Sequence, residues 1–113
     1  MSEVAPMINS RSSFGCTVNV HNNEIYVAGG YTDGFTTRKC EAYNVASNTW
    51  RELPNLNEEK CASSLSVMGG RYLYCIGGFT KNDTAGALLL TTIEMLDLWT
   101  PNAKWITLPI RLP

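Results

Sequence analysis

The sequence predicts an all-β fold made of two similar units, each of them a four-stranded antiparallel sheet. The first observation behind this prediction is a repeat, because residues 6–30 and 54–78 have equal length and share their landmark residues. The second is that short apolar runs of strand length alternate with turn residues, while no apolar stripe of helical period extends over helical length. We therefore expect almost no helix.

The repeat is defined by residues that lie 48 positions apart. The matching pairs are Pro6 with Pro54, Ile8 with Leu56, Asn9 with Asn57, Ile25 with Leu73, Tyr26 with Tyr74, and Gly29-Gly30 with Gly77-Gly78. Beyond the double glycine the offset grows to 55 through loop insertions, but further landmarks return in the same order. These are Glu41-Ala42-Tyr43-Asn44 with Glu94-Met95-Leu96-Asp97, and Thr49-Trp50 with Lys104-Trp105.

Four strands are predicted in the first unit, at residues 14–20, 24–28, 40–45 and 49–53. In the first strand Cys16 lies on the same side as Val18 and Val20, so we expect it to be packed. The second strand is apolar nearly throughout, which is typical of a strand buried on both faces. The run 88–90 is the one place where a turn of helix would fit the sequence.

A double glycine after the second strand, then Glu-x-Tyr-Asn, then a Trp at the start of the fourth strand resembles the kelch-repeat family over residues 6–109. The resemblance implies two consecutive four-stranded blades of a β-propeller, an incomplete ring because propellers have about 4–8 blades. It gives structural roles to the double glycines, one Tyr and two Trp, which are Gly29, Gly30, Tyr43, Trp50, Gly77, Gly78 and Trp105. Leu96 departs from the family pattern, which has Tyr there.

The repeat also predicts the domain organisation. We expect an N-terminal tail at 1–5, a first blade at 6–53, a second blade at 54–109 and a C-terminal tail at 110–113. Two blades leave apolar faces and strand edges open to water. The chain is therefore expected to be a fragment of a longer protein, to assemble with copies of itself, or to complete the propeller of another chain.

Composition argues against several classes of function. Nine basic and ten acidic residues give no basic patch for nucleic acid or for a membrane surface. The N-terminus lacks a signal peptide, which predicts a cytoplasmic protein with reduced thiols. No cysteine spacing indicates a metal or cofactor site, and His21 has no catalytic partner nearby in the sequence. Cys75 is expected to be buried, whereas Cys40 and Cys61 lie near loops and are the candidates for an exposed, redox-active thiol.

The loops after the double glycines, 31–39 and 79–90, are the best candidates for a binding surface. In kelch proteins that hold peptides, the contacts come from these loops and from the segment before the first strand. Carried over by position, together with the arginine of the first loop, this gives Ser13, Tyr31, Asp33, Arg38, Cys61, Phe79 and Lys81. The simpler interpretation of each is an exposed loop residue. Likewise, Glu58-Glu59-Lys60 is either a solvated turn or a charged rim that steers a partner.

The resemblance implies a protein-protein interaction module rather than an enzyme. Within the family this role includes substrate adaptors of ubiquitin ligases. A structural component of a large or cytoskeletal assembly is the alternative. An enzyme with a site on the propeller axis is the alternative from another class, but two blades with one histidine supply few catalytic groups.

Overall fold

The computed structural model describes residues 5–9, 11–82 and 86–113, which form twelve β-strands and, within these ranges, no helix. The first four-stranded sheet, blade one, has the order β1-β2-β5-β6. Its strands are β1 (Gly15–Asn19), β2 (Glu24–Ala28), β5 (Cys40–Asn44) and β6 (Thr49–Leu53). All neighbours are antiparallel, so the predicted blade is confirmed, with β1 and β5 slightly shorter than expected.

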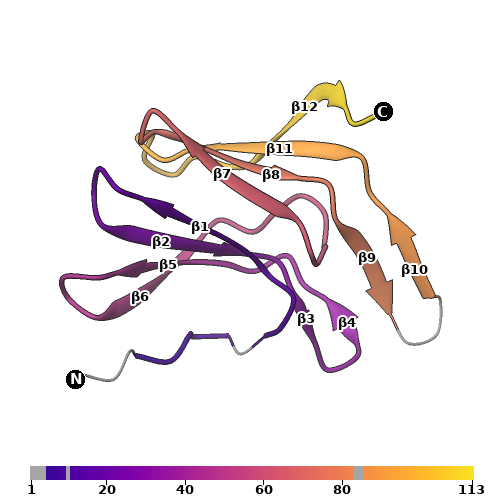
Figure 1. Ribbon diagram of the computed structural model, residues 1–113, viewed down its shortest axis with the longest axis horizontal. Helices are drawn as coiled ribbons and strands as arrows, with labels where there is room; N and C mark the ends of the chain where they lie inside the picture. Colours follow the sequence, from indigo (N-terminus) through magenta and orange to yellow (C-terminus); the bar gives the residue numbers. More distant parts are fainter. Residues whose placement is uncertain (1–4, 10, 83–85) are drawn as a thin grey trace.

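Blade two repeats this arrangement in the order β12-β11-β8-β7. Its strands are β7 (Ser64–Met68), β8 (Tyr72–Ile76), β11 (Thr92–Asp97) and β12 (Ile106–Arg111). The two blades lie one above the other in Figure 1, and β1 packs against β7. The fold class is thus confirmed. The domain boundaries stay predictions, and β12 runs past the expected end of the second blade at residue 109.

The loops after the double glycines are themselves hairpins, which the sequence analysis did not predict. They form a third sheet, the hairpin sheet, in the order β10-β9-β4-β3. Its strands are β3 (Tyr31–Thr32), β4 (Phe35–Thr36), β9 (Phe79–Asn82) and β10 (Gly86–Leu89). The run 88–90 therefore continues a strand through Leu89 instead of turning into helix. Residues 83–85 of this region lie outside the described residues.

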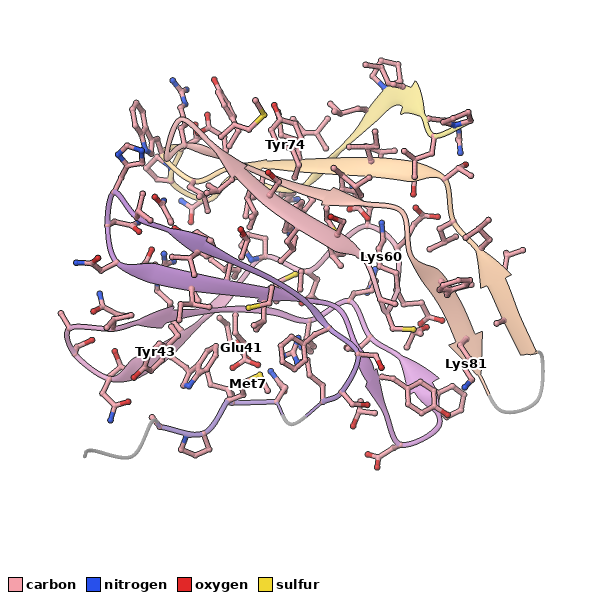
Figure 2. All side chains as sticks on the ribbon, viewed as in Figure 1. Met7, Glu41, Tyr43, Lys60, Tyr74 and Lys81 are labelled. Atoms are coloured by element: carbon pink, nitrogen blue, oxygen red, sulfur yellow. The ribbon has the colours of Figure 1, made fainter. Side chains whose placement is uncertain are left out.

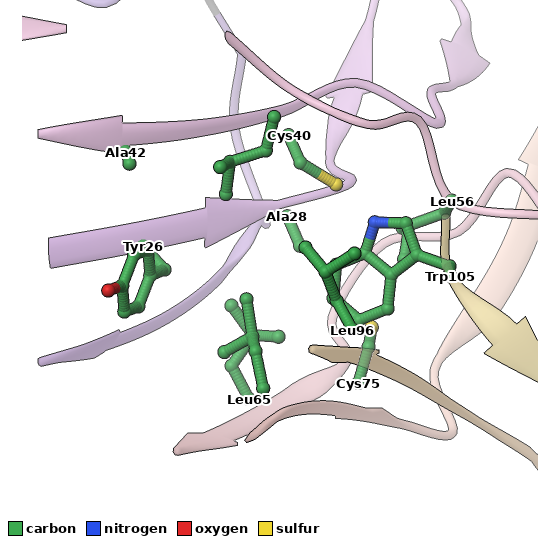
Figure 3. Packing of buried hydrophobic residues seen from close by; sticks show 11 residues of the cluster. Tyr26, Ala28, Cys40, Ala42, Leu56, Leu65, Cys75, Leu96 and Trp105 are labelled. Carbon is green, nitrogen blue, oxygen red and sulfur yellow. The ribbon is translucent and has the colours of Figure 1, made fainter. Parts of the chain in front are cut away.

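The hydrophobic core lies between the two blades (Figure 3). Blade one contributes Tyr26, Ala28, Cys40 and Ala42, and blade two contributes Leu65, Leu73, Cys75, Leu96 and Trp105. The blades approach closely at Gly15, where an added Cβ would lie 3.0 Å from Leu65 Cγ. Burial of this apolar surface is the main force that holds the blades together.

The face of β1 that packs inward differs from the prediction. Cys16 is exposed, and Val18 and Val20 on the same side of the strand are 51% and 76% exposed. The expectation that Cys16 is packed was therefore wrong. The inward face instead carries Gly15 and fully buried Asn19, whose Nδ2 donates to Tyr26 Oη at 3.2 Å and to Gly70 O at 3.1 Å. Glycine at position 15 leaves room for Leu65 of the neighbouring blade, and the side chain of Asn19 reaches that blade through its hydrogen bond to Gly70.

Blade two has an open apolar face. In blade one Tyr26 pairs with Ala42, and both are fully buried by blade two. The equivalent pair in blade two, Tyr74 with Met95, is only half-buried, since no further sheet of the described residues covers that side. Figure 2 shows Tyr74 on the side of blade two that points away from blade one. In the described part of the chain, no helix is long and apolar enough to cross a bilayer.

Candidate partner-binding face

A buried carboxylate fixes the extended segment that precedes each blade. Glu41 is fully buried and accepts the backbone N–H groups of Ile8 at 2.6 Å and Asn9 at 3.2 Å. The guanidinium of Arg11, whose side chain is also fully buried, forms an ion pair with the same carboxylate. Figure 2 shows Glu41 and Tyr43 on the face of blade one that Met7 covers. The leading segment is thus held by charge-assisted hydrogen bonds.

The same device recurs between the blades. Glu94 accepts the N–H of Asn57 at 2.6 Å and forms an ion pair with Lys60, whose Nζ lies 2.7 Å from Glu94 Oε2. Both side chains are fully buried. Lys60 is therefore not part of a solvated turn, which corrects the simpler interpretation of Glu58-Glu59-Lys60 for this residue.

The double glycines lie where the linker passes closest to blade one and the hairpins. An added Cβ on Gly29, at φ +66°, would lie 2.3 Å from Lys60 O, and on Gly78, at φ +104°, 2.6 Å from Cys61 O. Gly30 N donates to Lys60 O at 2.8 Å. A side chain at Gly29 or Gly78 would push the linker away, so the chain can pass this close only at glycine.

The two tryptophans have different surroundings. Trp105 is 3% exposed in the core between the blades, and its Nε1 donates to Pro54 O at 2.8 Å. Trp50 is half-buried on the outer side of blade one, where its Nε1 donates to Ala5 O at 2.7 Å. Tyr43 packs beside Trp50 with ring centroids 5.0 Å apart. Each indole therefore holds the extended segment before its own blade.

Five of the seven predicted binding residues come together at the hairpin end of the blades. Cys61 pairs with Phe79 through reciprocal backbone bonds of 2.8 and 2.9 Å, and Ser13 O accepts the N–H of Ala62 at 2.6 Å. Lys81 Nζ lies 5.1 Å from the ring centroid of Tyr31, a cation–π contact between the two units. Figure 2 shows Lys81 beside the aromatic rings of this end.

The remaining two predicted residues lie around this group. Asp33 is at the exposed tip of the β3–β4 turn. Arg38 is exposed and lines an open depression of about 520 Å³ at the edge of the hairpin sheet. The depression is lined by Arg38, Asn57, Glu58, Glu59, Thr80, Leu88 and Leu90. It offers an apolar wall with charges of both signs.

Exposed aromatic rings are the prominent feature of the hairpin end. Phe35 is 60% exposed and Phe79 is 41% exposed. Phe35 was missed by the sequence analysis, although Asp33-Gly34 just before it is a strong hairpin signal. Both turn residues have positive φ, +49° and +88°. Aromatic residues on a rigid, hydrogen-bonded hairpin are well suited to anchor a partner.

The thiols are not suited to redox chemistry in the way the sequence suggested. Cys40 and Cys61 are 2% and 8% exposed, so the expectation that they are the exposed cysteines was wrong. Burial, followed by the neighbouring Cys75, raises the pKa of Cys40 to about 12. Burial also raises the pKa of Cys61, and Lys81 partly opposes this shift. A thiol that stays protonated is a poor nucleophile.

At the opposite end of the blades, unit two carries an arginine–aromatic cluster. The Arg71 guanidinium lies 4.9 Å from the ring centroid of Tyr72 and 5.0 Å from that of Trp99. It donates to Asp97 through two bonds of 3.0 and 2.9 Å, which hold the pKa of that carboxyl well below its usual range. Among the described residues, no three His, Cys, Asp or Glu side chains are grouped to hold a metal ion.

Stacked four-stranded blades joined through a double glycine, a buried glutamate and a tryptophan define a kelch-type β-propeller segment. Residues 13–57 match the model of the Kelch motif, and the chain belongs to the kelch-repeat family. It is 39% identical to Kelch-like protein 40 of Mus musculus over 106 aligned residues. These residues make up 91% of this chain and 16% of the mouse protein.

Other relatives show the same pattern. Kelch-like protein 41a of Danio rerio is 31% identical over 97 residues, which are 86% of this chain and 16% of that protein. Kelch repeat and BTB domain-containing protein 1 of Camelpox virus is 33% identical over 97 residues, which are 84% of this chain and 16% of that protein. The chain thus spans about a sixth of the length of these relatives. The similarity to these kelch-repeat proteins supports the interpretation of the chain as a protein-interaction module.

Proposed function

We propose that the chain binds a protein partner through its hairpin end, with Phe35 and Phe79 as the apolar anchors. The observation that carries this proposal is the joining of the hairpins from both units into one sheet, which displays these rings on hydrogen-bonded strands. Lys81 over Tyr31 ties the two hairpins together and so limits the conformational entropy lost on binding. Exposed Arg38 adds a hydrogen-bond donor at the rim.

A finer form of the proposal is that these blades belong to the substrate-binding part of a ubiquitin-ligase adaptor. It rests on the resemblance to the kelch family and requires domains beyond these residues. The open face of blade two favours a second candidate, a structural component of a larger assembly, because half-buried Tyr74 and Met95 are placed to pack against a neighbour. The cytoplasmic location stays a prediction.

The test is a selection of peptides from a display library on the folded chain, followed by affinity measurements for the recovered peptides. Phe35→Ala and Phe79→Ala should each weaken binding at least about tenfold, because truncation of an anchor residue typically costs about 2 kcal/mol or more. Val45→Ala is the matched control, since Val45 is 51% exposed and directly follows β5 at the end of the strand remote from the hairpins. Equal losses for Val45→Ala, or no loss for either phenylalanine, would contradict the proposal.

A further inference from the structure

A cleft opens between the two blades at the end remote from the hairpins. In Figure 1 the β5–β6 turn and the β11–β12 loop both lie at that end. The cleft has a volume of about 350 Å³, which is near the lower end of the range for binding sites in proteins. One wall comes from β6 and the start of the linker, and the other from the end of β11 and the loop that follows. The residues that line it include Arg51, Leu53, Leu96, Leu98, Pro101 and Ala103.

The floor of the cleft continues the hydrophobic core. Leu53 and Leu96 are 8% and 2% exposed and belong to the core cluster. Leu98 and Ala103 are partly buried and pack against that cluster. An apolar group placed in the cleft would therefore leave water and contact core leucines, which is favourable in proportion to the area covered.

The loop wall is specific to unit two and is held in place by hydrogen bonds. The landmarks that flank it, Asp97 and Trp105, are eight positions apart, whereas their counterparts in unit one are six positions apart. Leu98 N donates to Arg71 O at 2.8 Å, and Thr100 Oγ1 donates to Asp97 Oδ2 at 2.7 Å. The longer loop is therefore fixed before a ligand arrives, which reduces the entropy lost on binding.

The rim of the cleft carries a hydrogen-bond donor that is still available. Arg51 extends across β5 to β2, where its Nε and Nη2 donate to the Glu24 carboxylate. Ala42 is directly opposite Arg51 in the strand pairing, and its small side chain leaves room for this path. Within the described part of the chain, no hydrogen bond engages Arg51 Nη1, and 56% of this side chain is exposed. The Nη1 group can therefore donate to an acceptor in the cleft.

The charges around the cleft are already paired. Arg51 forms an ion pair with Glu24, and Asp97 forms one with Arg71. The side chain of Glu52 lies on the face of β6 opposite to that of Arg51, because successive side chains of a strand alternate. An ionised group in the cleft would lose hydration without gaining a counter-charge. A neutral group is therefore the complement of this site.

We propose that this cleft binds one apolar side chain of leucine or methionine size from an extended segment of a protein partner. A backbone carbonyl of that segment accepts a hydrogen bond from Arg51 Nη1. The core leucines supply the apolar contact, and the internally paired charges disfavour a lysine or glutamate side chain. This site lies at the opposite end of the blades from Phe35 and Phe79, so it does not depend on the partner-binding role of those residues.

Small probes test the chemistry of the site directly. N-acetyl-leucine methylamide, and for comparison the corresponding lysine and glutamate compounds, are titrated into the ¹⁵N-labelled chain while the backbone amide resonances are recorded by NMR. The leucine probe should shift the resonances of residues 51–53 and 98–103 in a saturable way, with a dissociation constant of about 1–10 mM, the affinity expected of a ligand of this size. The charged probes should bind at least about fivefold more weakly.

Two substitutions remove the two interactions separately. Ala103→Leu fills the cleft and should weaken binding of the leucine probe at least about tenfold. Arg51→Lys keeps a cation beside Glu24 but lacks the second arm of the guanidinium fork, so it should weaken binding about fivefold. Ala46→Leu is the matched control, because Ala46 is exposed in the shorter turn of unit one, and it should leave binding unchanged. The dispersion of the same spectra verifies that each variant folds.

Several results would overturn the proposal. They are the absence of saturable shifts at several times the expected dissociation constant, equal affinity of a charged probe, and undiminished binding to folded Ala103→Leu. If Ala103→Leu does not fold, undiminished binding to Arg51→Lys is the contradicting result. Peptide binding at Phe35 and Phe79 is measured separately and at the other end of the blades, so the two proposals fail independently.

Discussion

Single residues show most clearly how each blade holds the chain that leads into it. In each blade a buried glutamate, Glu41 or Glu94, accepts the backbone N–H groups of the leading segment. A cation of that segment, Arg11 or Lys60, forms a buried ion pair with the same glutamate. The sequence analysis found Glu41 and Glu94 as landmarks but did not recognise Arg11 and Lys60 as their buried partners. Those two are 49 positions apart, because the linker carries one extra residue, and one of them is Arg while the other is Lys. An exact offset of 48 therefore does not align them.

Removal of one member of a buried ion pair should be costly. Glu94→Ala leaves the buried Lys60 ammonium with only the more distant and partly exposed Glu58, whose Oε1 lies 3.8 Å away, and we expect it to lower the free energy of unfolding by about 3–5 kcal/mol. Urea unfolding followed by tryptophan fluorescence measures this. Arg71→Ala breaks the exposed pair with Asp97 and should have a much smaller effect. Similar losses for the two variants would show that Lys60 and Glu94 are not buried together.

Thiol reactivity distinguishes the four cysteines. Cys16 is the exposed one, so it should react with a maleimide in the native protein, whereas Cys40 and Cys75 should react only after unfolding. The pKa of Cys40 of about 12 means that its thiol stays protonated in the folded chain, while the unfolded thiol ionises near the ordinary value of 9.0. Its stabilising contribution is therefore complete below about pH 9 and is lost as the pH rises toward 12.

The measurement is mass spectrometry of the native protein after brief labelling at pH 8. One label, located on Cys16, is the expected result, and Cys16→Ser should then give an unlabelled protein. Labelling of Cys40 at a rate similar to that of Cys16 would contradict the buried position of β5. The prediction that Cys16 is packed failed because period-two alternation defines two faces of a strand but does not say which one is buried.

At the scale of elements, the eight strands of the two blades could be predicted from alternation and turn residues, and the hairpin sheet could not. Strands of two residues carry too little periodicity to be recognised. Asp33-Gly34 was an available signal for the first hairpin. The pairing of β4 with β9 depends on how the blades stack, which local sequence does not encode. The two glycine pairs, in contrast, were recognisable because they recur.

Gly29 and Gly69 have the same backbone conformation but different surroundings, so their alanine variants distinguish the cost of a steric contact from the cost of backbone strain. Gly29 and Gly69 have φ of +66° and +62°, but only Gly29 would place a Cβ against backbone, 2.3 Å from Lys60 O. We expect Gly69→Ala to cost about 1–2 kcal/mol of unfolding free energy, the left-handed backbone penalty alone. Gly29→Ala should cost clearly more, because it also displaces the linker. Thermal or urea unfolding measures both, and equal costs would mean that the linker does not pass this close.

At the scale of the whole molecule, the incomplete stack of blades determines behaviour in solution. The open face of blade two exposes part of Tyr74, Met95 and neighbouring apolar side chains. Faces of this kind drive association in water. Repetition and the limit on blade number allowed the sequence to predict this openness. The exposed β10 edge, however, became visible only in three dimensions.

The purified chain should therefore self-associate in a concentration-dependent way, measured by light scattering. Met95→Lys introduces a charge on the open face and should shift the population toward monomer. Val45→Lys, on an exposed site away from this face, is the control and should leave the association unchanged. A wild-type chain that stays monomeric at millimolar concentration would show that the open face does not attract a neighbour.

The stacking of two separate blades is tested most directly by nuclear Overhauser effects in the methyl-labelled chain at low concentration. Gly15 of blade one lies within van der Waals distance of the Leu65 side chain of blade two. The account predicts a strong effect between the Gly15 α-protons and the Leu65 methyl groups, together with cross-strand effects inside each blade. Absence of the Gly15–Leu65 effect, with backbone effects that instead join β1 and β7 as hydrogen-bonded neighbours of one continuous sheet, would contradict it.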